Sequence, residues 1–202
     1  MQIVKYSLLE FLEPGNLIIN PVNTEGYMGK GLALEIAIRF PETEKKYKET
    51  CKKGELKPGE IFFYKENDII IGNMATKSRF KYPSKIEWIQ LGVENLKRYL
   101  IQNAIQNKVI IPKIGSGLGK LSWKEVKVLI EKTFKDFDNV IIALDEEKGP
   151  KETKAIREYY THEISTDLFH TITNEKVERF RELLEQKGIG KNKYAMYVRK
   201  YF

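Results

Sequence analysis

The sequence predicts an α/β protein with a mixed, mostly parallel sheet covered by helices on both faces, followed by a small helical appendage. Apolar segments of strand length alternate with amphipathic segments of helix length, and two glycine-rich stretches each follow a buried strand. The 202 residues suffice for one such domain with its own core. We expect the domain to span residues 1–148, and a basic, mainly helical extension to span residues 149–202.

The amino-acid composition excludes several classes of protein. Lys and Arg number 35 against 28 acidic residues, and the formal charge of +7 fits either attraction to a polyanion or a role in solubility. No apolar segment reaches the roughly 18 residues of a spanning helix, and the N-terminus enters a strand directly, so we expect a cytoplasmic protein. The single Cys51 excludes an internal disulfide framework, and His162 and His170 are too few for a zinc site. We expect no metal.

Elements of the first half follow from apolar runs and from helix-breaking residues. A helix that begins at Gly31 is stopped by Pro41, and a charged helix that follows it ends at Gly54. Four polar residues separate two apolar runs, which predicts a pair of strands with a tight connection. The expected strands are residues 2–6, 17–20, 61–64 and 69–74, and the expected helices are residues 31–40 and 42–53.

Two helices of the second half are expected to begin with capping boxes. Ser84 precedes Glu87 by three residues, and Ser122 precedes Glu125 by three. The inner face of the first of these helices is expected to carry Trp88, Gly92, Leu96, Leu100 and Ile101. Further strands are expected at residues 109–112 and 140–144, and further helices at residues 151–160 and 175–187, the last capped by Asn174.

The two glycine-rich stretches, residues 26–31 and 115–119, are the strongest functional signal. Glycine lets backbone amides approach a ligand, and the positive end of a helix dipole favours an anion. Because ligands of such sheets bind outside the carboxyl ends of the strands, both stretches are expected to line one pocket for a phosphate-bearing ligand. Neither stretch fits the Rossmann or P-loop fingerprint.

Few side chains near these stretches have catalytic chemistry, since neither Cys nor His is close in sequence. Asn20 and Asn23 would either orient ribose hydroxyls or, as the residues alone favour, bond the turn backbone. Lys77 begins a basic loop with Arg79 and Lys81, where an ammonium group can lose its proton and become a nucleophile. From the residues alone, an ordinary solvated lysine is the preferred interpretation.

The last sixteen residues, 187–202, contain five cations, no acid and three interleaved tyrosines, Tyr194, Tyr197 and Tyr201. Cations bind phosphates and aromatic faces stack on bases, which is one interpretation of this segment. The preferred alternative is a helix that packs its tyrosines into the protein.

Three ordered blocks of the sequence resemble macrodomains: residues 20–24 with 28–33, residues 73–77 with 83–88, and residues 111–123. Within that family the chain looks most like the DarG antitoxin branch, which is similar to the human terminal ADP-ribose protein glycohydrolase. The resemblance covers about residues 1–145. It implies a three-layer α/β/α macrodomain that binds ADP-ribose and removes it from a modified target, which is a DNA base for DarG-like members.

The resemblance also implies roles for individual residues. Lys77 matches the branch's catalytic lysine, proposed to attack the anomeric carbon and open the ribose ring, which reverses the preference reached above. Asn23 would be the second catalytic residue and would contact the distal ribose. Gly119 stands where the human enzyme has an aspartate. Residues 28–32 would hold the diphosphate, residues 116–119 would close over its other side, and adenine recognition is expected near Leu8. The implied ligand-binding residues are Leu8, Leu9, Asn20, Thr24, Met28, Gly29, Lys30, Gly31, Leu32, Thr76, Gly115, Ser116, Gly117, Leu118 and Gly119.

The expected function is therefore removal of ADP-ribose from modified nucleic acid, with ADP-ribose as ligand or product and no cofactor. ADP-ribosylated DNA, or another nucleic acid, and a cognate ADP-ribosyltransferase toxin are the expected partners. Three alternatives remain open: a non-catalytic reader of ADP-ribose, a hydrolase acting on ADP-ribosylated protein side chains, and a nucleic-acid-binding protein whose pocket is incidental.

Overall fold

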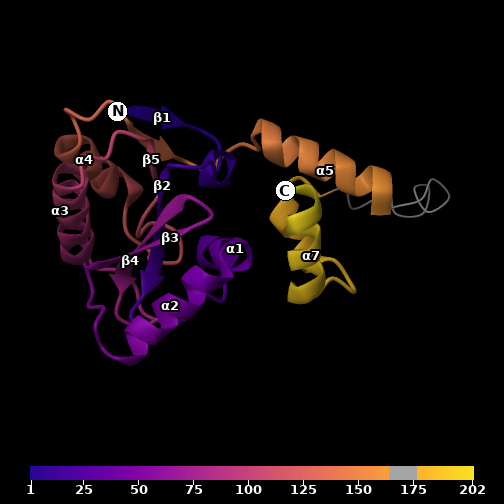
Figure 1. Cartoon of the computed structure of the whole chain (residues 1–202), viewed down its shortest axis with the longest axis horizontal. Coiled ribbons are helices and arrows are strands. Elements are labelled where there is room, and N and C mark those ends of the chain that lie inside the picture. Colours follow the sequence, from indigo (N-terminus) through magenta and orange to yellow (C-terminus); the bar gives the residue numbers. More distant parts are fainter. Residues whose placement is uncertain (164–176) are drawn as a thin grey trace. The chain divides into compact units, whose positions relative to one another are not determined.

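The computed structural model describes residues 1–163 and 177–202 (Figure 1). These residues divide into two compact units, Met1–Asp145 and Glu146–Phe202. The first unit contains a sheet with helices, and the second contains helices. Asn174 and His170 lie outside the described residues.

The first unit is built on one sheet of mixed direction. Its strands lie in the order β1-β6-β5-β2-β4-β3, all neighbours being parallel except β3 and β4, which form an antiparallel hairpin. The mixed, mostly parallel sheet predicted from the sequence is thereby confirmed. The strands are β1 (Gln2–Val4), β2 (Leu17–Asn23), β3 (Ile61–Glu66), β4 (Ile69–Lys77), β5 (Val109–Pro112) and β6 (Val140–Ala143).

Helices cover both faces of this sheet, as Figure 1 shows. On one face lie α1 (Gly31–Arg39) and α2 (Pro41–Lys52), where Tyr47 is fully buried against side chains of β2 and β4. On the other lie α3 (Ile86–Gln102) and α4 (Trp123–Thr133), which pack onto the larger apolar cluster. Because the central strands are buried on both faces, they read as continuous apolar runs in the sequence. The three-layer arrangement is confirmed.

The start and the buried face of α3 differ from the prediction. Lys85 is the N-cap and no side chain caps the helix, so the capping box of Ser84 and Glu87 is wrong. The Ser84 N–H donates instead to the Gly119 carbonyl at 2.9 Å, which turns Ser84 towards the second glycine-rich stretch. Ile101 is 63% exposed and Trp88 only half-buried. The buried face consists of Ile89, Gly92, Val93, Leu96 and Leu100, whose spacing keeps one stripe on the sheet.

At α4, Ser122 is the N-cap as expected, but its side chain makes no capping hydrogen bond. A short 3-10 helix, η1 (Leu8–Phe11), follows β1. Ser7 caps it through a hydrogen bond from the Leu9 N–H to its hydroxyl at 3.3 Å.

The described part of the second unit contains α5 (Pro150–Glu163), the 3-10 helix η2 (Phe180–Glu185) and α7 (Lys191–Tyr201). The described part of the helix expected at residues 175–187 is thus a short 3-10 helix, and the α-helical prediction there is wrong. The buried Glu152 carboxylate accepts hydrogen bonds from the Arg179 guanidinium at 3.0–3.1 Å and from the Phe180 N–H at 2.9 Å, which holds η2 against α5. Among the described residues of the expected span, the helix covers only Phe180–Glu185.

The tyrosines of α7 are largely buried within that unit. Tyr194 and Tyr197 are almost fully enclosed, and the Tyr201 hydroxyl donates to Glu163 at 2.6 Å. Two of the three rings considered for base stacking therefore face the core of their own unit, which is the packed-helix arrangement.

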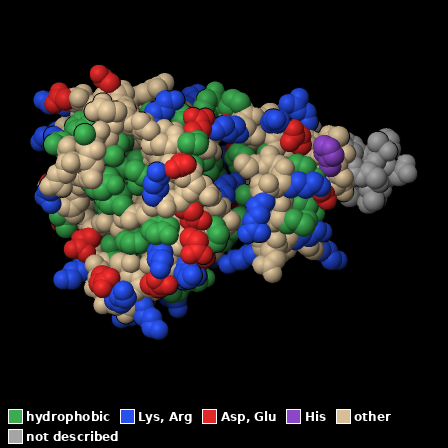
Figure 2. All heavy atoms as spheres, in the orientation of Figure 1, with side chains coloured by type: hydrophobic (Ala, Val, Ile, Leu, Met, Phe, Trp, Pro, Cys, Tyr) green, Lys and Arg blue, Asp and Glu red, His purple; other side chains and the backbone are tan. Residues whose placement is uncertain are grey.

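Charge is spread over the surface. Figure 2 shows basic and acidic side chains interspersed on the visible face, with hydrophobic side chains between them. Among residues 1–163 and 177–202, no helix is long and apolar enough to cross a membrane. The same residues contain no cluster of three or more His, Cys, Asp or Glu that would hold a metal ion.

Candidate functional site

A cavity of about 880 Å³ opens at the carboxyl edge of the sheet. Residues that follow each of the five parallel strands line it: Ser7 after β1, Asn23 at the end of β2, Lys77 at the end of β4, Gly115 after β5 and Asp145 after β6. Carboxyl edges of parallel strands are the usual place for ligands because strand-to-helix loops and helix N-termini converge there. The volume suits a ligand of nucleotide size.

The first glycine-rich loop leaves β2 and enters α1. Asn23 organises it, because its Oδ1 accepts hydrogen bonds from the Glu25 and Tyr27 N–H groups at 2.9 and 3.3 Å while its Nδ2 donates to the Tyr27 carbonyl at 2.7 Å. The Tyr27 ring lies over Gly29, where a Cβ atom would come within 2.2 Å of it. Gly31 opens α1 with φ +56° and lines the cavity. The free amides of the first turn of α1 thus lie at the cavity.

The second glycine-rich loop leaves β5 and closes the opposite side. Its turn is tight: the Leu121 N–H donates to the Gly115 carbonyl and the Lys120 N–H to the Gly117 carbonyl, both at 3.0 Å. A Cβ atom on Gly119 would lie 2.2 Å from the Gly115 oxygen and 2.5 Å from the Ser84 hydroxyl. Position 119 therefore admits only glycine in this conformation.

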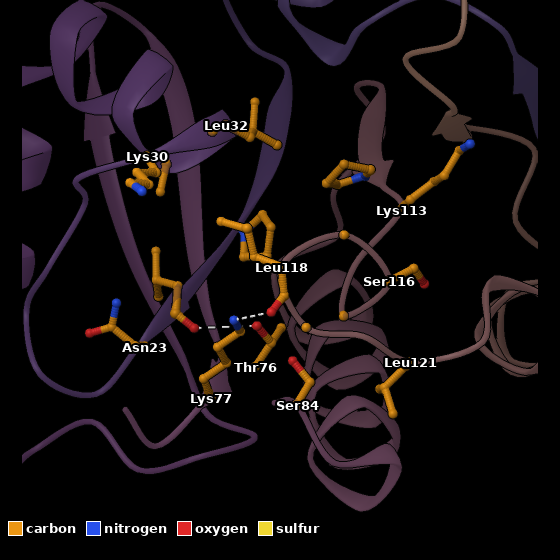
Figure 3. A pocket seen from close by; sticks show the side chains of 18 of the residues that line it. Asn23, Lys30, Leu32, Thr76, Lys77, Ser84, Lys113, Ser116, Leu118 and Leu121 are labelled. Carbon is orange, nitrogen blue, oxygen red and sulfur yellow. Dashed lines mark hydrogen bonds between the residues drawn. The ribbon is translucent and has the colours of Figure 1, made fainter. Parts of the chain in front are cut away.

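Lys77 lies between the two loops, as Figure 3 shows. Its Nζ donates to the Leu118 carbonyl at 2.5 Å, so the end of β4 is tied to the tip of the second loop. Burial lowers the pKa of Lys77 below its ordinary value, and the nearby charge of Lys120 lowers this pKa further. A neutral amine can keep its hydrogen bond to Leu118 while its lone pair is directed into the cavity.

Most expected site residues are brought together on this cavity. Both Lys77 and Asn23 line it. So do Leu8, Gly29, Lys30, Gly31, Leu32, Thr76, Gly115, Ser116, Gly117, Leu118 and Gly119.

Four expected ligand residues lie off the lining. Asn20 is fully buried in mid-strand because β2 continues to Asn23, and it donates to Asn73 of β4 at 2.9 Å. Thr24 ties the first loop to the loop after β4 through the Ser78 carbonyl at 2.7 Å. Leu9 and Met28 are buried apolar residues. None of these four residues is among those that line the cavity.

Several residues that line the cavity were not predicted as site residues from the sequence. Ser84 was expected to cap a helix, residues 143 and 144 were expected to end a strand, and residue 145 had no expected role. Their signal was available, because every parallel strand contributes its carboxyl end to the same edge. The further lining residues that the sequence-based set lacked include Ser7, Tyr27, Phe80, Lys81, Ser84, Lys113, Lys120, Leu121, Trp123, Ala143, Leu144 and Asp145.

The Macro domain family model matches residues 19–130, which include both glycine-rich loops and Lys77. A DNA ADP-ribosyl glycohydrolase from Thermus aquaticus is 33% identical over 144 residues, covering 69% of this chain and 39% of that protein. The Thermus aquaticus DarG macrodomain superimposes with a TM-score of 0.63 at 30% identity, covering 74% of this chain and 97% of that one.

A protein from Thermosipho africanus extends the comparison. This DNA ADP-ribosyl transferase–DNA ADP-ribosyl glycohydrolase fusion protein is 29% identical over an alignment of 127 residues, which covers 54% of this chain and 33% of the fusion. The structure of Thermosipho africanus DarTG in complex with ADP-ribose has a TM-score of 0.60 at 29% identity, covering 66% of this chain and 39% of that one. The matched region is thus a minor part of each full-length relative named here.

Proposed function

The chain belongs to the macrodomain family, and we propose that it is an ADP-ribosyl glycohydrolase that removes ADP-ribose from modified nucleic acid, with Lys77 as the nucleophile. One observation carries the proposal: Lys77 lies in the cavity between the two glycine-rich loops, and its pKa is lowered by burial and by Lys120. The names of the Thermus and Thermosipho relatives support this substrate class.

The two glycine-rich loops would bind the ADP-ribose group. The diphosphate would lie against the amides at the start of α1, where Gly31 leaves room for it, and the second loop would close over its other side. Asn23 holds the first loop in place through the Glu25 and Tyr27 backbone. It acts as a positioning residue whose effect on the ribose passes through that loop.

The chemical half would proceed through a covalent adduct. The Lys77 lone pair forms a bond to the anomeric carbon, the bond to the base breaks, and the base leaves with the proton that the lysine nitrogen gives up. The ribose ring then opens: the nitrogen forms a C=N bond, and the ring oxygen leaves the carbon and is protonated. Water adds to the C=N bond, and expulsion of the amine returns Lys77 and releases ADP-ribose.

A wild-type assay over several linkages tests this function. The full chain is incubated with ADP-ribosylated single-stranded DNA, ADP-ribosylated RNA and peptides modified on acidic side chains, and released ADP-ribose is quantified. We expect release from the nucleic acids to be fastest. Release only from peptides would reassign the substrate class, and tight ADP-ribose binding with no release would establish a reader, the alternative that Gly119 in place of an acid favours.

Two further features belong to the proposal. A cognate ADP-ribosyltransferase is the proposed partner, because transferase and glycohydrolase share one chain in the Thermosipho fusion protein. The cytoplasm is retained as the proposed compartment, since the proposed substrate is nucleic acid.

Removing the charge of Lys120 is expected to move the pH dependence of hydrolysis. Lys77 reacts as the neutral amine, so kcat/KM should rise with pH up to the pKa of Lys77 and then level off. Without Lys120, the Lys77 ammonium group is no longer repelled by a neighbouring charge, so the pKa of Lys77 increases. The increase of kcat/KM with pH then occurs at higher pH, and the rate at neutral pH falls.

Lys120→Asn is the suitable variant because residue 120 has φ +63°, which asparagine tolerates. The pH profile of kcat/KM is measured beside Lys124→Asn, which removes the same formal charge from the first turn of α4. A shift to lower pH, or an equal shift in both variants, would contradict the assigned cause.

Ser84→Ala is expected to separate ligand binding from stability. The Ser84 hydroxyl is buried at the cavity and has no hydrogen-bond partner among the described residues. Since a buried hydroxyl without a partner costs about 1–3 kcal/mol, its removal should leave the free energy of unfolding unchanged or raise it. ADP-ribose affinity should fall by about 5–10-fold if the ligand is the missing partner.

Urea unfolding and calorimetric titration with ADP-ribose measure the two effects of Ser84→Ala. The control is Ser122→Ala, the N-cap whose side chain makes no capping bond. Unchanged affinity in Ser84→Ala would show that the hydroxyl is satisfied by something other than the ligand.

A further inference from the structure

Three exposed aromatic rings come from the first glycine-rich loop and from the segment after β4, and two of them, Tyr27 and Phe80, line the cavity. Tyr27, Phe80 and Tyr82 are 48, 44 and 52% exposed, and the first two rings lie 4.8 Å apart. The Arg79 guanidinium lies 5.8 Å from the Tyr82 ring, and the Lys81 ammonium lies 5.6 Å from the Phe80 ring. We call these five residues the aromatic rim. Scattered exposed rings are ordinary, whereas a group of them beside a cavity marks a binding surface.

The aromatic rim begins inside the cavity and continues outside it. Tyr27, Phe80 and Lys81 line the cavity, while Arg79 and Tyr82 lie beyond the lining. Lys77, the proposed nucleophile, starts the same segment. A ligand larger than ADP-ribose would contact Tyr27 and Phe80 at the cavity and would reach Tyr82 by continuing along this segment.

The loops hold these rings in a defined position. The Phe80 N–H donates to the Glu25 carboxylate at 2.8 Å, and the Tyr82 N–H donates to the Arg79 carbonyl at 3.1 Å. Farther along, the Ser84 N–H is bonded to the second glycine-rich loop. Because the rings are exposed while their backbone is fixed, a partner that stacks on them would lose little loop entropy.

The positive charge of residues 76–85 indicates a negatively charged partner. Residues 76–85 contain Lys77, Arg79, Lys81 and Lys85 and no acid. Cations that follow a phosphate backbone and rings on which bases stack are the features of single-strand binding surfaces. Bases inside a duplex are already stacked on their neighbours and cannot offer their faces to these rings. Tyr194 and Tyr197 of α7, by contrast, are buried and unavailable for stacking.

We propose that the aromatic rim is the docking surface for single-stranded nucleic acid flanking the modified base. Neighbouring bases stack on the rings of the aromatic rim, and the phosphates face Arg79 and Lys81. This inference rests on the proposed function, because it takes the modified base to sit beside Lys77. It adds that the enzyme reads a strand and not only the ADP-ribose group.

A comparison of two substrates tests the proposal. One is a mononucleoside carrying ADP-ribose on its base, and the other is a ten-nucleotide single strand carrying the same group. Tyr82→Ala and Arg79→Gln, both outside the cavity lining, should each raise KM for the strand by about five- to tenfold. Neither should change kcat, nor kcat/KM for the mononucleoside. Controls are Ile101→Ala, which removes a similarly exposed apolar side chain, and Lys97→Gln, which removes a cation that also lies near an aromatic ring.

A binding assay without chemistry separates this proposal from the proposed function. Fluorescence anisotropy with unmodified ten-nucleotide thymidylate should show binding that weakens with salt and weakens again in Tyr82→Ala, even if no substrate is hydrolysed. A blunt DNA hairpin should bind more weakly and be insensitive to Tyr82→Ala. Three results would overturn the docking surface while leaving hydrolysis intact. They are equal kcat/KM of the wild type for the strand and the mononucleoside, equal effects of Tyr82→Ala or Arg79→Gln on the two substrates, and no binding of the unmodified strand.

Discussion

Replacing Lys77 with alanine is expected to lower kcat for release of ADP-ribose from DNA by about 10³-fold or more. The variant removes the group that would form the proposed covalent adduct, and among residues 1–163 and 177–202 no cysteine or histidine lines the cavity to replace it. ADP-ribose affinity should change by less than about fivefold, because in the proposed binding mode the diphosphate is held by backbone amides of the two loops. Calorimetry and a single-turnover release assay measure the two quantities.

Lys77→Arg distinguishes a nucleophile from a simple positive charge. Arginine keeps the charge and much of the stem but stays protonated at all working pH values, so it has no lone pair to offer. We expect it to be as inactive as Lys77→Ala. Activity retained in Lys77→Arg would point to electrostatic stabilisation instead.

The adduct itself is also detectable. Borohydride added during turnover should reduce the C=N bond and leave ADP-ribose attached at residue 77, which peptide mass spectrometry can locate. The nucleophile assignment fails if wild-type protein turns over rapidly under these conditions and carries no such adduct.

Gly119→Ala is expected to destabilise the protein by about 2–3 kcal/mol, a large effect for one methyl group. The added Cβ would lie 2.2 Å from the Gly115 carbonyl oxygen, which is fixed backbone and cannot move without opening the second loop. The same clash bars Gly119→Asp, so a single substitution should not install the aspartate of the human enzyme. Both variants should also bind ADP-ribose weakly, because the loop that closes over the ligand is displaced.

Gly117→Ala in the same loop is the matched control. A Cβ atom at residue 117 has open space around it, so the free energy of unfolding should change by less than about 0.5 kcal/mol. Urea unfolding of the three variants measures this difference. If Gly119→Asp unfolds like wild type and hydrolyses faster, the loop adapts more readily than the contacts indicate.

Local sequence patterns predicted most of the helices and strands correctly. The wrong predictions have a common cause, which is contact between residues far apart in the sequence. The apolar runs of β2, β5 and β6 and the break at Pro41 are signals within a few residues. Each of these strands begins at the expected residue, but β2 continues three residues beyond its expected end, to Asn23. Ser84 has the sequence context of a helix cap, yet its N–H bonds to Gly119, 35 residues away, and no local pattern contains that bond. The tyrosines of α7 likewise look suited to stacking until Tyr159 and Phe180 enclose them.

For the site, the sequence by itself determined the family, the two glycine-rich loops and the presence of Lys77 after a strand. Only the tertiary structure decided which of those residues share a cavity, since that depends on a strand order in which β2 lies between β5 and β4. In the folded chain, Asn20 lies within the sheet and bonds to Asn73, and Asn23 bonds to the backbone of the first glycine-rich loop. The tertiary structure placed Lys120 close enough to lower the pKa of Lys77, and it exposed the aromatic rim. The physical reason is that exposure, proximity and charge repulsion are properties of distances between residues far apart in the chain, and composition and spacing do not contain those distances.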